Sequence, residues 1–348
     1  MGKLFLKIVV LFLFLTTVNL FLFSFIKLPF SWGNFYEKEY CLEKNAGQFN
    51  TVLIGSSRVY RQVDILLFDS LNQNSTDTHT FNFGIDGVTI AESYYEFENI
   101  LKIRDLKAKY IIVELCDVDT FAKENLHTVR KKYYYDTKAY LTSVKVLWQS
   151  AYSVTRKLQS TFAHTVNLFE CVSHFNSLNE IVPFRKNELN APYGCNNFYS
   201  PLSEKDSTHN FGLNGEVTTP HKELLKHIDQ LTFLRKNTKE LYAGSSVNNT
   251  PGSTYFSIAQ RMIEEGNKRS VKVIFVLPPK LEEIHYRNVW PVFNALPAAN
   301  RIDLGNPVKY PLFYELQYAY DLGHVNEVGA RFYTEALSQE FKSLINPK

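Results

Sequence analysis

Two short stretches, far apart in the 348-residue chain, contain side chains that could form a hydrolytic site. Near the start, "TVLIGSSRVYR" (Thr51–Arg61) is an apolar run that ends in a glycine, two serines and an arginine. Near the end, "DLGHVNEVG" (Asp321–Gly329) holds an aspartate three residues before a histidine. The aspartate can accept a hydrogen bond from one imidazole nitrogen and leave the other to take a proton from a serine. A serine beside such a base is a nucleophile, whereas the same serine without a base belongs to an ordinary polar turn.

A third stretch offers backbone groups for the negative charge that such chemistry develops. "FNFGIDG" (Phe81–Gly87) places two glycines after a second apolar run. Glycines allow the backbone to approach a ligand closely, so that N–H groups can point at an oxyanion. The turn at Gly55 offers the free amides of a following helix in the same way. Each of these turns, taken alone, is also typical of a plain strand-to-helix connection.

Alternating apolar runs and helical patterns predict the elements that would bring these stretches together. Such alternation indicates an α/β fold with a parallel sheet and helices on both of its faces. In these sheets the active site lies at the carboxyl ends of the strands, where the serine and glycine turns would converge. The expected strands are Thr51–Gly55, His79–Gly84, Lys109–Cys116, Val271–Pro279 and a short one in "NRIDLG", and an amphipathic helix ends the chain.

In order and in strand context, "IGSSR", "FNFG" and "DLGH" resemble the first, second and last motif blocks of the SGNH (GDSL-like) hydrolase superfamily. The resemblance spans about Thr51 to the C-terminus, without the middle section. It implies a three-layer α/β/α sandwich with a mostly parallel sheet. It also implies Ser57 as the nucleophile, His324 as the base and Asp321 as the orienting acid, with the amides of Ser57 and Gly84 as oxyanion donors. Neither a cofactor nor a metal is required.

The chain departs from the superfamily pattern in two places. Ser56 stands where the usual first block has an aspartate, and "VELCDVDTF" lacks the Gly-x-Asn-Asp block expected after the third strand. A missing oxyanion donor can cost about two to three orders of magnitude in rate. "GSS" turns and "D-x-x-H-x-N-x-x-G" endings are similar to those of the membrane-anchored branch that includes teichoic-acid D-alanyl transfer and alginate O-acetylation proteins.

That branch implies a serine-dependent O-acyl (acetyl) esterase or transferase that acts on a cell-surface polysaccharide or another envelope polymer. A membrane acyltransferase would be a partner of such a protein. The alternative is a non-catalytic SGNH-like scaffold that binds a membrane acyltransferase.

The first thirty residues predict a membrane anchor. Ile8–Ile26 is an uncharged run rich in Leu, Phe and Val, and about 20 apolar residues span a bilayer as a helix. A cleaved signal peptide is the competing interpretation, but no small-x-small cleavage site follows the run. Lys3 and Lys7 favour a cytoplasmic N-terminus and an extracytoplasmic body. We therefore expect a single-pass anchor at 1–30, a polar connector at 31–48 and the α/β domain at 49–348, with a helical and loop-rich insertion at about 120–250.

Other groups in the chain could also form a site. The formal charge of +3, without a basic block interleaved with aromatics, gives no support to nucleic acid as a partner. Glu114, Asp117 and Asp119 are expected to be loop acids or contacts in the active-site rim rather than metal ligands. Arg58 could pair with an acid or a substrate anion, or lie on a helix surface.

The remaining histidines, cysteines and clustered tyrosines fit structural roles better than a site. Tyr133–Tyr135 could stack on a sugar, although aromatic packing is the simpler interpretation. Cys171 and Cys195 could pair in an oxidising compartment, and Cys116 is expected to be buried. The histidines without ligand spacing are His127, His164, His174, His209, His221 and His227.

Overall fold

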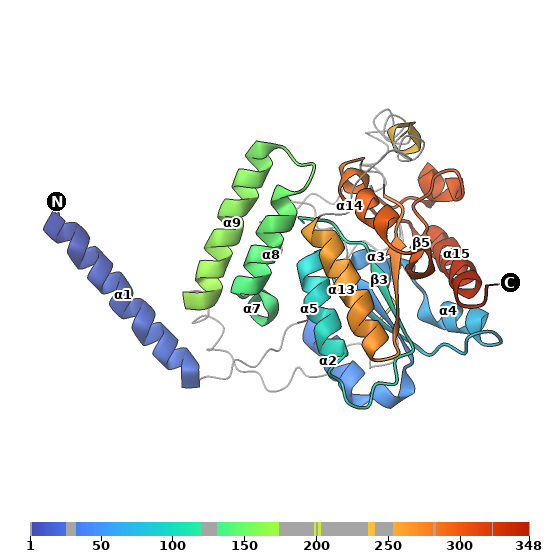
Figure 1. The fold of residues 1–348 in the computed structure, drawn as a ribbon, viewed down its shortest axis with the longest axis horizontal. Coiled ribbons are helices and arrows are strands. Elements are labelled where there is room, and N and C mark those ends of the chain that lie inside the picture. The colour runs from blue at the N-terminus through green and yellow to red at the C-terminus, as the bar shows by residue number, and fades with distance from the viewer. Residues whose placement is uncertain are drawn as a thin grey trace.

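The computed structural model describes residues 2–25, 33–119, 131–173, 198–199, 201–202, 236–240, 253–280, 283–321 and 323–347. Five strands form one parallel sheet in the order β2-β1-β3-β4-β5 (Figure 1). The strands are β1 (Thr51–Gly55), β2 (Thr80–Gly84), β3 (Tyr110–Glu114), β4 (Lys272–Leu277) and β5 (Arg301–Asp303). The predicted α/β fold on a parallel sheet is confirmed, and each expected strand is present.

The N-terminal apolar helix α1 extends away from the sheet, and the expected amphipathic helix at the end of the chain is α15 (Figure 1). The helices used below are α1 (Gly2–Phe25), α2 (Gly33–Lys44), α3 (Ser57–Gln62), α4 (Ile65–Asn72), α5 (Ile90–Ile100), α7 (Lys131–Tyr134), α8 (Thr137–Trp148), α9 (Val154–Ser173), α13 (Thr254–Lys268), α14 (Glu283–Ala295) and α15 (Glu327–Ile345).

Two hydrophobic clusters hold the helices on the sheet. Successive side chains of a strand point to opposite faces, and in β1 Val52 and Ile54 join one cluster while Leu53 joins the other. The first cluster includes residues of α5, α13 and α14, and the second includes residues of α3, α4 and α15. Because both faces of the sheet are apolar, polar side chains gather where the strands end, and this edge is where the predicted site residues lie.

Two segments differ from the expectation. The stretch expected to be a polar connector contains helix α2, whose Cys41 and Leu42 are fully buried in the first cluster. Lys38 of α2 is buried as well and donates to the carbonyl oxygen of Gly84 at 2.5 Å. Helix α14 is not among the elements predicted from the sequence, and Pro291 lies inside it.

Helix α1 is long and apolar enough to cross a membrane. Its segment Gly2–Phe21 has a mean hydropathy of 2.3, and only 6% of the segment's most apolar window is buried inside the protein. An N-terminal helix with these properties is also compatible with a signal sequence.

The cysteines pair differently from the suggested pattern. Cys41 is in a disulfide, whereas Cys171 and the buried Cys116 carry thiols. The suggested Cys171–Cys195 disulfide is therefore wrong, and Cys195 itself lies outside the described residues.

Candidate active site

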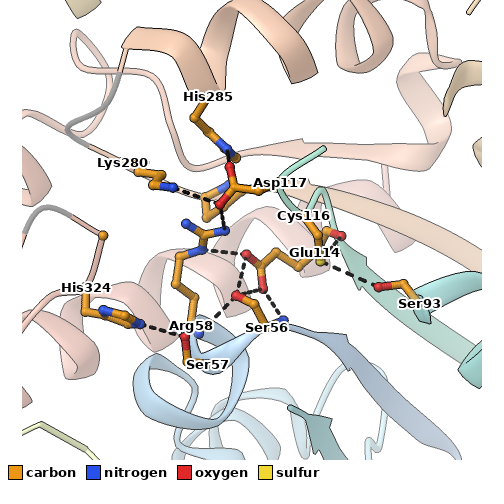
Figure 2. Close-up of polar contacts among 12 residues, drawn as sticks. Ser56, Ser57, Arg58, Ser93, Glu114, Cys116, Asp117, Lys280, His285 and His324 are labelled. Carbon is orange, nitrogen blue, oxygen red and sulfur yellow. Dashed lines mark hydrogen bonds and ion pairs between the residues drawn. The ribbon is translucent and has the colours of Figure 1, made fainter. Parts of the chain in front are cut away.

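Ser57, His324 and Asp321 form a continuous chain of hydrogen bonds (Figure 2 shows Ser57 facing His324). The Oγ of Ser57 lies 2.7 Å from Nε2 of His324. On the other side of the ring, Nδ1 of His324 lies 2.9 Å from both carboxylate oxygens of Asp321. Since an ionised carboxylate only accepts, Nδ1 carries the proton, and the bare Nε2 is left to accept the proton of the serine. The three residues predicted from the sequence are thus brought together in the required geometry.

The loop before α15 fixes the position of His324. Asp321 Oδ1 accepts the N–H groups of Gly323 and His324, both at 2.7 Å. Asn326 caps α15 by accepting the Gly329 N–H at 3.0 Å, and its own amide donates to the carbonyl of Gln317 at 2.7 Å. Asn326 therefore ties both sides of the histidine loop together.

Gly329 is required at its position by space. A Cβ atom there would lie 2.7 Å from the carbonyl oxygen of Tyr318 and 2.7 Å from Cβ of Val325. Because Gly329 has no Cβ atom, the first turn of α15 packs directly against the histidine loop. The stretch "HVNEVG" thus needs Asn326 to cap α15 and Gly329 to let the helix pack against the loop.

Asp321 is held in its ionised form. Burial by itself would raise the pKa of this carboxyl, but His324 and the amides of Gly323 and His324 outweigh burial and lower the pKa below its usual value. A carboxylate that stays ionised can hold the imidazole in one tautomer and stabilise the imidazolium that forms when Ser57 gives up its proton.

Ser57 is the first residue of α3, and the turn that precedes it is clamped by Glu114 at the end of β3. The Ser56 N–H donates to Oε2 of Glu114 at 2.7 Å, and the Ser56 hydroxyl donates to the same carboxylate at 2.8 Å. The Ser56 Oγ also accepts the Arg58 N–H as the cap of α3. Ser56 is thus committed to structure, which leaves Ser57 as the serine that meets the base. A carboxylate does stand at this turn, but it comes from Glu114 rather than from position 56.

Arg58 neutralises that carboxylate. Its Nε lies 2.5 Å from Oε1 of Glu114, and the two side chains are only 5% and 2% exposed. A second acid, Asp117, lies 3.8 Å from the same guanidinium (Figure 2). Burial by itself would lower the pKa of Arg58, but Glu114 and Asp117 raise it further above its already high value, so the side chain stays charged. The alternative of a helix-surface role for Arg58 is wrong.

Asp117 connects this pair to the end of β4. Its carboxylate accepts from Nζ of Lys280 at 2.8 Å and lies 2.5 Å from Nδ1 of His285 on α14. Burial would raise the pKa of Asp117, but Lys280, His285 and Arg58 together hold it well below its usual range. Sequence reasoning missed Lys280 and His285, and the double proline "LPP" that precedes Lys280 was the only local signal that a strand ends there.

Close packing explains why glycines stand at positions 55 and 84, at the ends of β1 and β2. A Cβ on Gly55 would lie 2.5 Å from Cβ of Glu114, so the glycine makes room for the clamping carboxylate. A Cβ on Gly84 would lie 2.7 Å from the backbone nitrogen of Tyr60, so the glycine lets α3 approach β2. The Gly84 N–H donates to Oδ1 of Asn82 at 3.0 Å. Gly84 can therefore donate to an oxyanion only if Asn82 releases its amide.

The other weighed groups have structural partners. Asp119 lies in the loop after β3, where it is buried and accepts the Ser160 hydroxyl at 2.6 Å. Tyr134 and Tyr135 are packed in a small aromatic cluster, as the simpler interpretation predicts, while the side chain of Tyr133 is not among those described. His164 is buried within hydrogen-bonding distance of Tyr135.

Metal-ligating side chains and the remaining histidines complete the set of candidate groups. Across the ranges that the structure describes, no three His, Cys, Asp or Glu side chains are arranged to hold a metal ion. The histidines that lie outside those ranges are His127, His174, His209, His221 and His227.

No protein-family profile and no curated protein sequence matches the chain.

The first prediction concerns the buried ion pair. Arg58→Met should lower the free energy of unfolding by about 3–5 kcal/mol, because it leaves the Glu114 carboxylate buried without its counter-charge. The double variant Arg58→Met/Glu114→Leu should be less destabilised than Arg58→Met alone, since no uncompensated charge remains. Urea denaturation of the detergent-solubilised full-length chain, followed by tryptophan fluorescence, measures both. Additive effects of Arg58→Met and Glu114→Leu would contradict the coupling.

A second prediction concerns acid stability. Burial lowers the pKa of His285, and Asp117 opposes this only in part. The folded chain therefore binds fewer protons than the unfolded chain as the pH falls below about 6.5, and stability is lost on acidification. His285→Asn keeps a donor for Asp117 but cannot titrate. The drop in unfolding free energy between pH 7.5 and pH 5.5 should shrink by about 1 kcal/mol in this variant. An unchanged drop would show that His285 does not carry the effect.

Proposed function

We propose that this chain is a serine-dependent O-acyl (acetyl) esterase or transferase of the SGNH type, built as a three-layer α/β/α sandwich. The observation that carries the proposal is the unbroken set of hydrogen bonds from Ser57 through His324 to Asp321. Its support includes the order of the three residues along the chain and their position at the carboxyl edge of a parallel sheet.

In the first half of the reaction Ser57 becomes acylated. Oγ attacks the acyl carbonyl carbon, its proton passes to Nε2 of His324, and the carbonyl electron pair moves onto oxygen. Asp321 stabilises the imidazolium that results. The tetrahedral intermediate then collapses, the ester C–O bond breaks, and His324 returns the proton to the leaving hydroxyl.

In the second half an acceptor removes the acyl group from Ser57. Water gives hydrolysis, and a sugar hydroxyl gives transfer, with His324 again taking and returning one proton. As the first residue of α3, Ser57 has a backbone N–H that no helical carbonyl can accept, so this group is a donor for the oxyanion. The amide of Gly84 would be a second donor after exchange of its Asn82 partner.

The proposed location is a membrane surface facing out of the cytoplasm. Helix α1 would be an uncleaved single-pass anchor, and Lys3 and Lys7 favour a cytoplasmic N-terminus. The disulfide at Cys41, only sixteen residues after the end of α1, supports an oxidising compartment for the body. An envelope polymer or surface polysaccharide is the substrate class that the sequence resemblance implies, with a membrane acyltransferase as partner.

Two observations favour the second candidate function, a non-catalytic scaffold for a membrane acyltransferase. The end of β3 carries Glu114 where the superfamily block would have an oxyanion asparagine, and the Gly84 amide is bonded to Asn82. A chain with a single ready oxyanion donor would be a slow enzyme. The two functions differ in whether Ser57 is reactive.

The test is reaction of the full-length protein with a fluorophosphonate, which phosphonylates activated serines with loss of fluoride. The wild type should be labelled, and Ser57→Ala should not. Asp321→Asn should slow labelling by about 10³–10⁴-fold, because the imidazole is no longer held in the right tautomer. Intact-mass spectrometry measures the extent of labelling with time.

Two serine variants serve as controls. Ser257→Ala on α13 removes an exposed hydroxyl far along the chain and should label like the wild type. Ser56→Ala should still label, at a reduced rate, because only the clamp to Glu114 is weakened. Equal labelling of wild type and Ser57→Ala, or no labelling of either, would reject the catalytic proposal in favour of the scaffold.

A further inference from the structure

Helix α9 buries polar residues and exposes large apolar ones, whereas a surface helix normally does the opposite. The buried residues of α9 are all polar, namely Ser160, His164, Asn167 and Ser173. The partly buried Ala163, Leu168 and Cys171 add apolar contacts to the cluster of Tyr134 and Tyr135. The outward face is apolar, and Phe162 is 72% exposed. At about 100° per residue, the exposed large apolar residues fall within a stripe about 80° wide that runs the length of the helix. We call this the α9 stripe, and it consists of Val154, Leu158, Phe162, Phe169 and Val172.

The polar contacts on the inner face fix the rotation of α9 about its own axis. Asn167 accepts from the buried Lys131 of α7 at 2.5 Å, and the Ser160 hydroxyl donates to Asp119 at 2.6 Å. Turning the stripe inward would break these buried hydrogen bonds and leave their polar groups unsatisfied. The apolar residues of α9 therefore face outward because the inner contacts require it.

The α9 stripe is continuous with the candidate membrane helix. The ring of Phe169 stacks on that of Phe12 of α1, with centroids 5.6 Å apart and planes 15° apart. About one turn further along α9 and two turns further along α1, Nδ2 of Asn19 donates to the carbonyl of Ser173 at 2.5 Å. In Figure 1, α9 is the labelled helix next to α1. The surface that α1 presents to its surroundings thus continues directly onto α9.

A tryptophan borders the stripe. The indole N–H of Trp148 on α8 donates to Oγ1 of Thr161 at 2.9 Å, and the Trp148 side chain is partly exposed beside α9. Tryptophan is enriched at the boundary between hydrocarbon and water, because its ring is apolar and its N–H is polar. Its position agrees with an interfacial setting for the α8–α9 pair.

From these contacts we infer that α9 lies against the same membrane that α1 spans, with the α9 stripe in contact with lipid acyl chains. The occupant is lipid because the stripe adjoins helix α1, whose exposed face would contact lipid as the proposed membrane anchor. The inference rests on the membrane anchor of the proposed function. Attachment through both α1 and α9 would hold the catalytic body in one orientation to the membrane, which a single helix followed by a linker cannot do.

Spin-label accessibility in lipid nanodiscs tests this inference. The full-length chain carries Cys116→Ser and Cys171→Ser, so that a nitroxide attaches only at an introduced cysteine. Phe162→Cys and, independently, Leu158→Cys report on the α9 stripe, and Gln159→Cys reports on an exposed position beside it. Collision rates are measured with oxygen, which concentrates in lipid, and with a nickel chelate, which stays in water. The discs contain phosphatidylcholine and phosphatidylglycerol in a 3:1 mixture, about one charged lipid in four.

The expected result is an oxygen-to-nickel accessibility ratio at positions 158 and 162 that exceeds the ratio at 159 several-fold. High nickel accessibility at the stripe would mean that it faces water, and low accessibility to both reagents would mean that protein covers it. Either result overturns the inference. Leu11→Cys on α1 separates the two claims, because lipid contact at Leu11 with water at Phe162 leaves the anchor in place and removes only the α9 contact. Water at both positions removes both, and the fluorophosphonate experiment depends on neither.

Discussion

The buried pair between Arg58 and Glu114 is the interaction on which the candidate active site depends. It joins the turn after β1 to the end of β3, and the same carboxylate accepts the N–H and the hydroxyl of Ser56. Because Ser56 is held on that carboxylate, the next residue begins helix α3 with its side chain directed at His324. A buried charge pair of this kind does little for net stability but makes every alternative arrangement costly, since separating the charges leaves each one desolvated.

The base reaches Ser57 by a different route. His324 lies on a loop held by Asp321 and Asn326, and the first turn of α15 presses on that loop through Gly329. The serine side and the histidine side of the site are therefore positioned by separate sets of contacts. Lys280, bonded to Asp117 and adjacent to the histidine loop, lies between the two sets. A parallel sheet makes this possible, because it delivers loops from distant parts of the chain to one edge.

Features that depend on a local stretch of sequence could be predicted, whereas features that depend on contacts between distant residues could not. The strands and the triad residues were accessible because apolar runs and short motifs are local signals. The Arg58–Glu114 pair was not, since its members are separated by 56 positions and no local pattern marks a pairing between strands. The assignment of Gly55 and Gly84 to oxyanion turns missed their packing roles, which depend on how closely α3 approaches the sheet. Helix α14, which was not predicted, contains Pro291 and is supported by the tertiary packing of residues such as Tyr286.

The central claim is that Ser57 is an activated nucleophile whose acyl oxyanion is received by its own backbone amide. The most direct measurement is a crystal structure of the protein after reaction with a fluorophosphonate. The account predicts phosphorus bonded to Oγ of Ser57, a phosphoryl oxygen within hydrogen-bonding distance of the Ser57 N–H, and His324 still paired with Asp321. Phosphorus bonded to another residue, or a phosphoryl oxygen directed away from that amide, would contradict it.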